Sequence, residues 1–149
     1  MKLSTRTRYG VRAMVELAEH HGQGPLQIKF IAERQNISVK YLEQLITMLR
    51  SGGFVRSVRG ARGGYMIAKP PEDIKLSEIF AALEGTIITT ECIDNKELCE
   101  RSVDCATREV WMKLHEAILN VLGSINLADV VKRSRQLQKK GTDKAEYQI

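Results

Sequence analysis

The sequence from Ile31 to Tyr65 is IAERQNISVKYLEQLITMLRSGGFVRSVRGARGGY. Its first part predicts a helix that ends near Gln35, a turn at residues 36–37, and a second helix capped by Ser38, whose hydroxyl can accept hydrogen bonds from the free first-turn amides. Apolar residues of the second helix recur at steps of three and four and predict its buried face: Val39, Leu42, Leu45, Ile46 and Leu49. Its opposite face carries Lys40, Tyr41, Gln44 and Thr47. The stretch therefore predicts a helix-turn-helix.

A β-hairpin is expected directly after these helices. Gly52 and Gly53 end the second helix, because glycine adopts the left-handed closing conformation without a steric cost. Two β-prone runs follow, at residues 54–58 and 65–68, and a glycine-rich tip with Arg59 and Arg62 lies between them. This order of elements is typical of a winged helix-turn-helix.

The charge of the hairpin separates DNA binding from the alternative, an ordinary helical hairpin followed by a loop. From residue 50 to residue 69 the chain has five basic residues and no acidic one: Arg50, Arg56, Arg59, Arg62 and Lys69. A structural turn needs its glycines but gains nothing from unopposed arginines, whereas a phosphate backbone or a groove edge does. The pattern and the charge together favour DNA binding.

The distribution of charge along the 149 residues is more informative than the net charge of +5. Residues 1–14 hold four bases and no acid, whereas residues 91–109 hold six acids against three bases. No apolar run is long enough to span a membrane and no signal-peptide core lies near Met1, so we expect a cytoplasmic protein with no membrane partner. Three cysteines, an odd number in a reducing compartment, argue against a disulfide framework.

The remaining elements are expected to be mostly helical. A first helix should run from Ser4 or Thr5 to about residue 21, the helix before the turn should span residues 26–35, and a short helix should span residues 76–83. Residues 86–90 are β-branched and expected to be extended. Residues 127–137 should form a shorter closing helix, followed by a polar, frayed end. The fold class is mainly α (α+β), a winged helix-turn-helix with a small β-hairpin wing.

A long helix near the C-terminus carries a heptad-like seam of apolar residues: Trp111, Leu114, Ile118, Val121 and Ile125. The simpler alternative is a helix that packs on its own domain. We favour a homodimer interface, because helix-turn-helix proteins usually bind two half-sites. The expected organisation is a DNA-binding domain at 1–84, a cysteine-rich loop at 85–107, dimerisation helices at 108–137 and a polar tail at 138–149.

Three cysteines, Cys92, Cys99 and Cys105, lie in the acidic segment before the long helix. They could be unrelated small hydrophobes, but their neighbours are too polar for a buried strand. Structural zinc usually has a two-residue knuckle and a second pair, which the chain lacks, whereas an iron–sulfur cluster tolerates a looser loop. Spacing alone leaves the cluster and its alternatives open. An enzyme with a cysteine nucleophile is disfavoured, because no acid–base constellation accompanies these cysteines.

The chain resembles the winged-helix regulators of the IscR, NsrR and CymR group over nearly its entire length. The matching motifs are Ser4-Thr5 with Arg8-Tyr9-Gly10, Tyr41-Leu42-Glu43-Gln44-Leu45, Arg59-Gly60 with Gly63-Gly64-Tyr65, and Leu83-Glu84-Gly85. The resemblance implies a dimeric transcription regulator whose long helix crosses to the partner subunit. It also implies that Cys92, Cys99 and Cys105 hold an iron–sulfur cluster, with 2Fe–2S preferred to 4Fe–4S. Members of the CymR kind work without this cluster, and a cluster-free regulator of cysteine or sulfur metabolism is the alternative.

The identity of a fourth cluster ligand is open. IscR has a histidine three residues after its last cysteine, where this chain has Arg108, which cannot ligate. NsrR uses an acidic residue from near the partner's N-terminus, where this chain offers Arg8. Asp104, Glu109, His115 or a residue from the partner remain candidates.

The expected partner is double-stranded DNA with a pseudo-palindromic operator. Phosphates should be contacted by Ser4, Thr5, Arg6 and Arg50. Base edges in the major groove should be met by Ser38, Lys40, Tyr41, Glu43 and Gln44. Arg59 and Arg62 of the wing should enter the minor groove, where narrow A·T tracts attract arginine.

Overall fold

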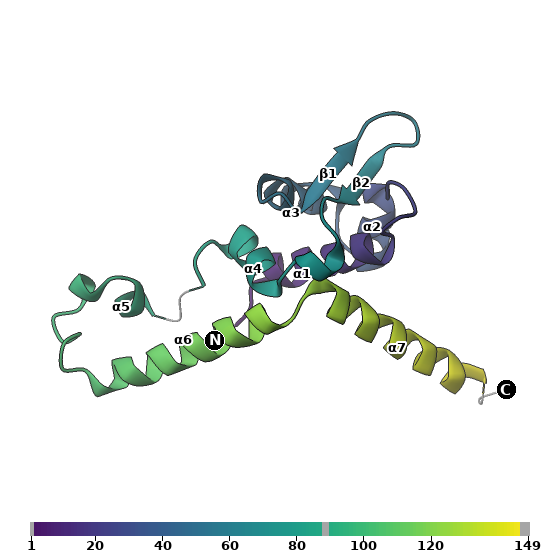
Figure 1. Ribbon diagram of the computed structural model, residues 1–149. Coiled ribbons are helices and arrows are strands. Elements are labelled where there is room, and N and C mark those ends of the chain that lie inside the picture. Colours follow the sequence, from purple (N-terminus) through teal and green to yellow (C-terminus); the bar gives the residue numbers. More distant parts are fainter. Residues whose placement is uncertain (1, 88–89, 147–149) are drawn as a thin grey trace.

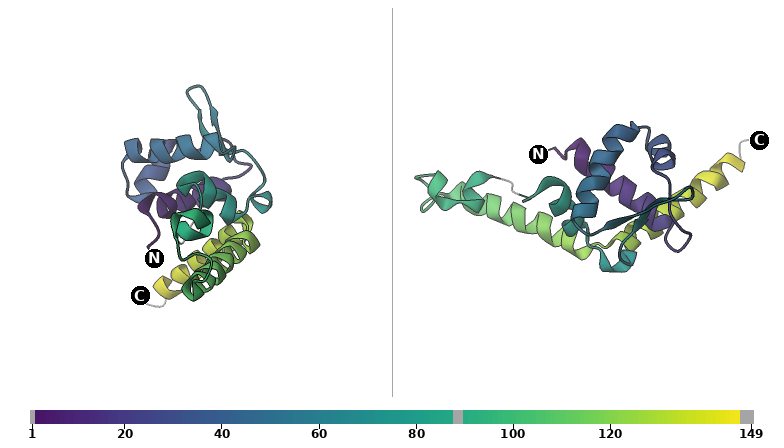
Figure 2. Two further views of the ribbon diagram at one scale, coloured as in Figure 1. Left: turned by 90° about the vertical axis from the view of Figure 1, so that its left-hand side faces the viewer. Right: turned by 90° about the horizontal axis from the view of Figure 1, so that it is seen from above.

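The computed structural model describes residues 2–87 and 90–146, with side chains through residue 141 (Figure 1). Helices α1–α3 and the hairpin strands β1 and β2 form a head, α4 joins the head to a loop, and α6 and α7 lie on the far side of α1 from α3 (Figures 1 and 2). The elements are α1 Thr5–Glu19, α2 Ile28–Gln35, α3 Val39–Ser51, β1 Val55–Val58, β2 Gly64–Ile67, η1 Pro71–Asp73, α4 Leu76–Glu84, α5 Glu91–Asp94, η2 Lys96–Leu98, α6 Ala106–Ser124 and α7 Leu127–Glu146.

The helix-turn-helix is formed by α2 and α3 as the spacing predicts. Asn36 closes α2 in the left-handed conformation, at φ 53°, and the Ser38 hydroxyl accepts from the amide of Tyr41 at 3.1 Å. Four of the five residues predicted to be buried in α3 are buried in the core, and Val39 is not, at 37% exposed. Val39 is the first helical residue after the cap, and Ile37 in the turn packs against the core instead.

The wing is a two-stranded antiparallel sheet that pairs Val55 with Ile67 and Val58 with Gly64. Leu26, predicted to lie in a helix, instead exchanges two backbone hydrogen bonds of 2.9 Å with Tyr65. The helix therefore begins two residues later than predicted, because the backbone groups of Leu26 are used by the sheet. This bridge fastens the wing to the start of α2.

The C-terminal elements differ from the sequence prediction in two respects. Helix α7 continues to Glu146 instead of ending near residue 137, and its Leu127 and Val131 are buried in the core of the head. Ile125, predicted on the long helix, lies just after α6, where its carbonyl accepts from the Leu76 amide at 3.0 Å and its side chain packs on the core. The predicted extension at residues 86–90 includes residues 88 and 89, which lie outside the described residues.

None of the helices in the described part of the chain is both long and apolar enough to span a membrane.

Helices α1 and α4 approach each other closely at Gly10. A Cβ atom on Gly10 would lie 2.4 Å from Leu83 Cδ1, and Leu83 is fully buried. Gly10→Ala is therefore expected to lower the free energy of unfolding by about 1–3 kcal/mol through overpacking. Urea denaturation measures this loss. Gly141→Ala is the control, because no atom lies within 4 Å of its added methyl, and it should be neutral or stabilising. Equal effects of the two changes would contradict the close approach.

Candidate nucleic-acid interface and cysteine loop

The exposed face of α3 carries the polar residues that the sequence predicts for base contacts. Lys40, Glu43 and Gln44 are exposed. Tyr41 is half-buried, and its ring packs edge-to-face on Tyr9 with the centroids 6.2 Å apart. Arg12, which sequence reasoning did not select, lies over the other ring of this pair, 5.6 Å from the Tyr9 centroid. Ser38 is exposed, and its hydroxyl caps α3. This residue therefore helps to fix the start of the helix.

A polar cleft of about 530 Å³ lies between the C-terminal half of α3 and the first strand of the wing. Its lining includes two guanidinium groups and three hydroxyls without a carboxylate: Thr47, Arg50, Ser51, Val55, Arg56 and Ser57. Arg56 was counted in the basic hairpin but not selected as a DNA contact. The alternation of side chains along a strand could have predicted the exposure of Arg56, because its neighbour Val55 is apolar and buried. Such a cleft suits a phosphate group.

The wing tip presents its two arginines to solvent. Arg59 and Arg62 are exposed between β1 and β2, and a turn from the Gly63 amide to the Gly60 carbonyl, at 2.9 Å, closes the tip. Gly60 has φ +111°, a conformation that other residues rarely adopt. Within the described residues the one ion pair joins Arg34 to Glu16, so neither wing arginine is neutralised by a carboxylate.

The residues predicted at the N-terminus to contact phosphate are partly engaged inside the chain. Ser4 caps α1, and the hydroxyls of Ser4 and Thr7 both donate to the Glu84 carboxylate at the end of α4. Arg6 Nη1 donates to the Leu83 carbonyl at 3.1 Å. Thr5 is exposed. These contacts hold the start of α1 against the end of α4. The cysteine loop begins directly after this point, at Gly85.

The contribution of Glu84 to the stability of the fold depends on pH. Hydrogen bonds from Ser4 and Thr7 hold the pKa of its carboxyl below the ordinary value. Because the folded-state pKa is depressed, the stabilisation is present above the unfolded-state pKa of about 4.3 and is lost as pH falls through the folded value. Glu84→Gln should lower the urea midpoint at about pH 7, and this loss should shrink progressively as the pH falls below about 4.3. Glu72→Gln is the control, because this exposed carboxyl makes no hydrogen bond within the described residues. An effect of Glu84→Gln that does not change with pH would contradict the assignment.

The three cysteines share the loop between α4 and α6 at the end of α6 remote from the head (Figure 1). Cys92 lies in α5, Cys99 follows η2, and Cys105 caps α6; all three are free thiols and partly exposed. Arg108 Nε donates to the Cys92 carbonyl at 3.0 Å and so ties α5 to the first turn of α6. Arg108, which stands where IscR has a histidine, therefore has a structural role in the loop.

The donor chemistry of the loop fits a metal–sulfur group, but its sulfur atoms are not gathered. A hydrogen bond with Thr107, 3.1 Å from the sulfur, and the Arg108 amide lower the pKa of the Cys105 thiol, which favours the thiolate form that binds metals. In residues 2–87 and 90–146, no three His, Cys, Asp or Glu side chains converge as metal ligands would. His115 lies ten residues after Cys105, about 15 Å along α6, which is too far to join Cys105 at one small cluster in the same chain.

The predicted seam is the exposed apolar surface of α6. Trp111, Leu114 and Val121 are 40%, 41% and 56% exposed, and Ile118 is half-buried. No residue of this 19-residue helix is buried. A helix with this much exposed apolar surface lacks a cover in the single chain.

Comparisons with known proteins agree with this geometry. The model of the Rrf2 family, described as "Iron-dependent Transcriptional regulator", matches residues 3–133. Protein rrf2 of Nitratidesulfovibrio vulgaris is 42% identical over 89% of this chain and 88% of its own length. Among solved structures, the global cysteine regulator CymR of Bacillus subtilis superposes with a TM-score of 0.77 at 41% identity, covering 89% of this chain and 98% of that one. T. potens IscR has a TM-score of 0.77 at 45% identity, covering 93% and 91%.

These similarities confirm the winged-helix fold and the resemblance to the IscR and CymR group. They place the chain among transcription regulators and not among enzymes. With a family model that spans most of its length and relatives that align along almost all of it, the chain belongs to the Rrf2 family of transcription regulators.

Proposed function

We propose that this chain is a homodimeric transcription regulator that binds double-stranded DNA at a pseudo-palindromic operator. The observation that carries the proposal is the combination of an exposed polar face on α3 with two wing-tip arginines that no carboxylate of the described residues neutralises. Between residues 38 and 69 the chain has six basic residues and a single acid, Glu43. A surface of this charge attracts the DNA backbone, and the isolated carboxylate can accept from a cytosine amino group. We expect the protein to act in the cytoplasm.

The contacts divide into positioning and base recognition. Lys40, Glu43 and Gln44 are proposed to contact base edges from α3, while Arg59 and Arg62 enter the minor groove. Arg50 and Arg56 hold a phosphate in the cleft between α3 and β1. Tyr41 supports α3 through its ring contact with Tyr9, and its hydroxyl completes the base-contacting set. Thr5 and Arg6 contact the DNA backbone beside the start of α1, whereas the Ser4 hydroxyl donates to Glu84 and so holds this segment in place.

The dimer is proposed to form through α6. Its exposed seam of Trp111, Leu114, Ile118 and Val121 repeats at steps of three and four, as a helix pair requires. Ile125 packs against the core of its own chain and follows the end of α6, so it would lie at the edge of the proposed interface. The two heads would then present two α3 helices to successive half-sites.

Selection from a random DNA library with the purified protein tests this function. The enriched sequences should contain two half-sites related by two-fold symmetry, and the affinity should fall steeply with salt. A motif without internal symmetry would contradict the dimer. Failure to enrich any sequence from protein shown to be folded and dimeric would contradict DNA recognition.

We further propose that Cys92, Cys99 and Cys105 hold an iron–sulfur cluster, with 2Fe–2S preferred, that reports cluster supply or redox state. Support comes from three free, partly exposed thiols on one loop, the lowered pKa of Cys105 and the similarity to IscR. When bound, the cluster would supply a redox-active centre that is lost when iron is scarce. The chain's own contribution is to lower the pKa of the Cys105 thiol through Thr107 and to hold α5 on α6 through Arg108.

A cluster-free regulator of the CymR kind is the second candidate, controlled by a protein or metabolite partner. Two observations favour it. The three sulfurs do not converge in the described residues, and CymR superposes as well as IscR does. In both candidates the DNA-binding head has the same role.

A further inference from the structure

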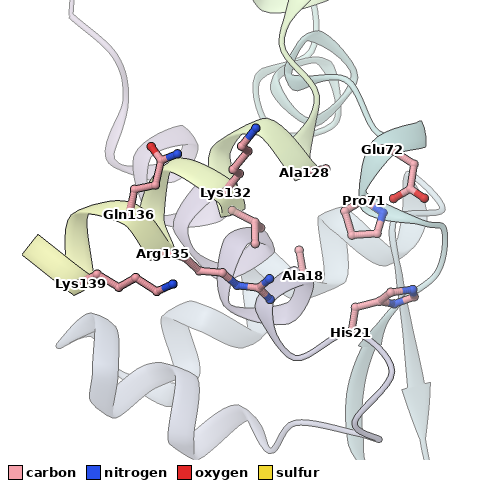
Figure 3. Close-up of a pocket in the computed structure, with 10 residues that line it drawn as sticks. Ala18, His21, Pro71, Glu72, Ala128, Lys132, Arg135, Gln136 and Lys139 are labelled. Carbon is pink, nitrogen blue, oxygen red and sulfur yellow. The ribbon is translucent and has the colours of Figure 1, made fainter.

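A cleft of about 440 Å³ lies where the end of α1, the short helix η1 and the first half of α7 meet (Figure 3). This volume falls within the range of about 300–1,000 Å³ that small-molecule sites occupy. Helix α7 supplies most of the lining, and its continuation past residue 137 adds Lys139.

The floor of the cleft is apolar. Ala18 of α1 and Val131 of α7 are buried side chains of the core, and Pro71 of η1 is buried beside them. Ala128 completes this surface. A ligand here would therefore meet a small hydrophobic surface that three separate elements hold in place.

The rim of the cleft is cationic. Lys132, Arg135 and Lys139 occupy positions i, i+3 and i+7 of α7 and lie on one face of the helix, and His21 lines the cleft from the loop after α1. Glu72 is the one carboxylate in the lining. In Figure 3 the Arg135 guanidinium lies between the Lys139 amine and the His21 ring, whereas the Lys132 amine points away from these groups.

These cations form no ion pair within the described chain. Arg135 Nη2 makes a long hydrogen bond of 3.4 Å to the Glu19 carbonyl, which orients the guanidinium at the end of α1. Lys132 and Lys139 have no recorded hydrogen bond, and the one ion pair of the described residues, Arg34 with Glu16, lies elsewhere. The lining of the cleft therefore contains three basic side chains and an imidazole but one carboxylate, arranged around an apolar floor.

The proposed DNA interface does not account for this surface. Helix α7 lies on the opposite side of α1 from α3, as two perpendicular views show (Figures 1 and 2). A duplex held by α3 and the wing would contact the other face of the head. The cations of α7 therefore call for a different ligand.

We propose that this cleft binds a small anionic molecule, with an apolar body on Ala18, Pro71 and Val131 and a carboxylate or phosphate at Arg135, while Lys132 and Lys139 flank it on the rim. Arginine and lysine donate charge-assisted hydrogen bonds to both anions, so the shared chemistry is an anionic head on a compact hydrophobic group. The site is independent of the cysteine loop and of the DNA interface, and its test does not depend on either.

The test is a titration of the ¹⁵N-labelled full-length protein followed by two-dimensional NMR at constant ionic strength. Phenyl phosphate and benzoate are the anionic probes, and benzyl alcohol is the neutral one. Both anions should produce saturable shifts centred on the amides of Ala18, His21, Ala128 and Val131, and the tighter probe identifies the preferred anion. Benzyl alcohol should bind far more weakly.

A matched pair of variants tests the role of the rim. Lys139→Gln should weaken binding of the anions about threefold, and the double variant Lys132→Gln/Lys139→Gln about tenfold, as expected for partly exposed charges. Lys140→Gln removes the same charge from the neighbouring position outside the cleft and should leave affinity unchanged. All of these side chains are exposed, so the variants should fold normally.

Several results would overturn the proposal. Shifts that do not saturate, or that spread over the surface, would indicate weak general attraction of anions. Equal binding of benzyl alcohol would show that charge has no part, and equal losses in Lys139→Gln and Lys140→Gln would show that the cleft is not the site.

Discussion

Replacing Arg59 and Arg62 together by alanine is expected to weaken operator binding about hundredfold, at about 1–2 kcal/mol for each lost groove contact. Both side chains are exposed at the wing tip and neither is neutralised by a carboxylate in the described chain. Nothing in the core depends on them, so the fold and the dimer should survive. Fluorescence anisotropy with the selected operator, at several salt concentrations, measures both the affinity and the slope of its salt dependence.

The control for this double variant removes the same charge from a surface remote from the interface. This control is the double variant Lys139→Ala/Lys140→Ala. Both residues are in α7, which lies on the other side of α1 from the wing (Figure 1). It should change operator affinity by less than about threefold, through net charge alone. If the wing and control variants lose affinity equally, the wing has no specific role and must be removed from the proposed interface.

Leu114→Asp is expected to convert the dimer into monomers and thereby to abolish tight operator binding. Leu114 is 41% exposed in the single chain and lies at the centre of the α6 seam, so a partner helix would bury the new carboxylate. Burial of an unpaired charge costs several kcal/mol, which corresponds to a loss of more than about hundredfold in dimer affinity. Sedimentation velocity over a range of protein concentrations measures the change.

Asn120→Asp provides a matched control on the same helix. Asn120 is exposed and lies about half a turn away from the seam, and its replacement introduces the same single charge. This variant should remain dimeric. If Leu114→Asp also remains dimeric at micromolar concentration while both variants are folded, α6 is not the dimerisation surface.

The sequence predicted the elements whose signals are local. The Ser38 cap, the buried face of α3 and the glycine-rich wing were each visible in fewer than about fifteen residues, because capping and helical periodicity act over short distances. Val39 and Leu26 show where this reasoning stops. Val39 has the right spacing but sits at the helix start beside a turn in which Ile37 packs inward, and Leu26 is recruited into a bridge with Tyr65, 39 positions away.

The C-terminal half was harder to predict because its structure depends on distant contacts. The polar stretch after Leu137 has no apolar periodicity to extend the predicted helix, yet α7, anchored in the core by Leu127 and Val131, continues to Glu146. The cleft beside α7 depends on how this helix lies against α1 and η1, which no local pattern reveals. Ile125 matched the heptad spacing of α6 but follows the end of that helix.

The site residues show the same division. Exposure of Lys40, Glu43 and Gln44 follows from helix periodicity, and exposure of Arg59 and Arg62 follows from their place in the glycine-rich turn between the strands. The contacts of Ser4 and Arg6 with α4 join residues nearly eighty positions apart, which no local pattern reveals. Cysteine spacing identified a candidate ligand set, but the positions of the sulfurs depend on a loop that has no regular core of its own.

The most direct test of the proposed sensor is a visible absorption spectrum of protein purified without oxygen, with assays of iron and acid-labile sulfide. We expect a brown protein that contains both iron and sulfide and loses them in Cys92→Ala. The spectrum would also distinguish a 2Fe–2S from a 4Fe–4S cluster. Protein that stays colourless and free of iron after anaerobic reconstitution would contradict the cluster and leave the cluster-free regulator of the CymR kind.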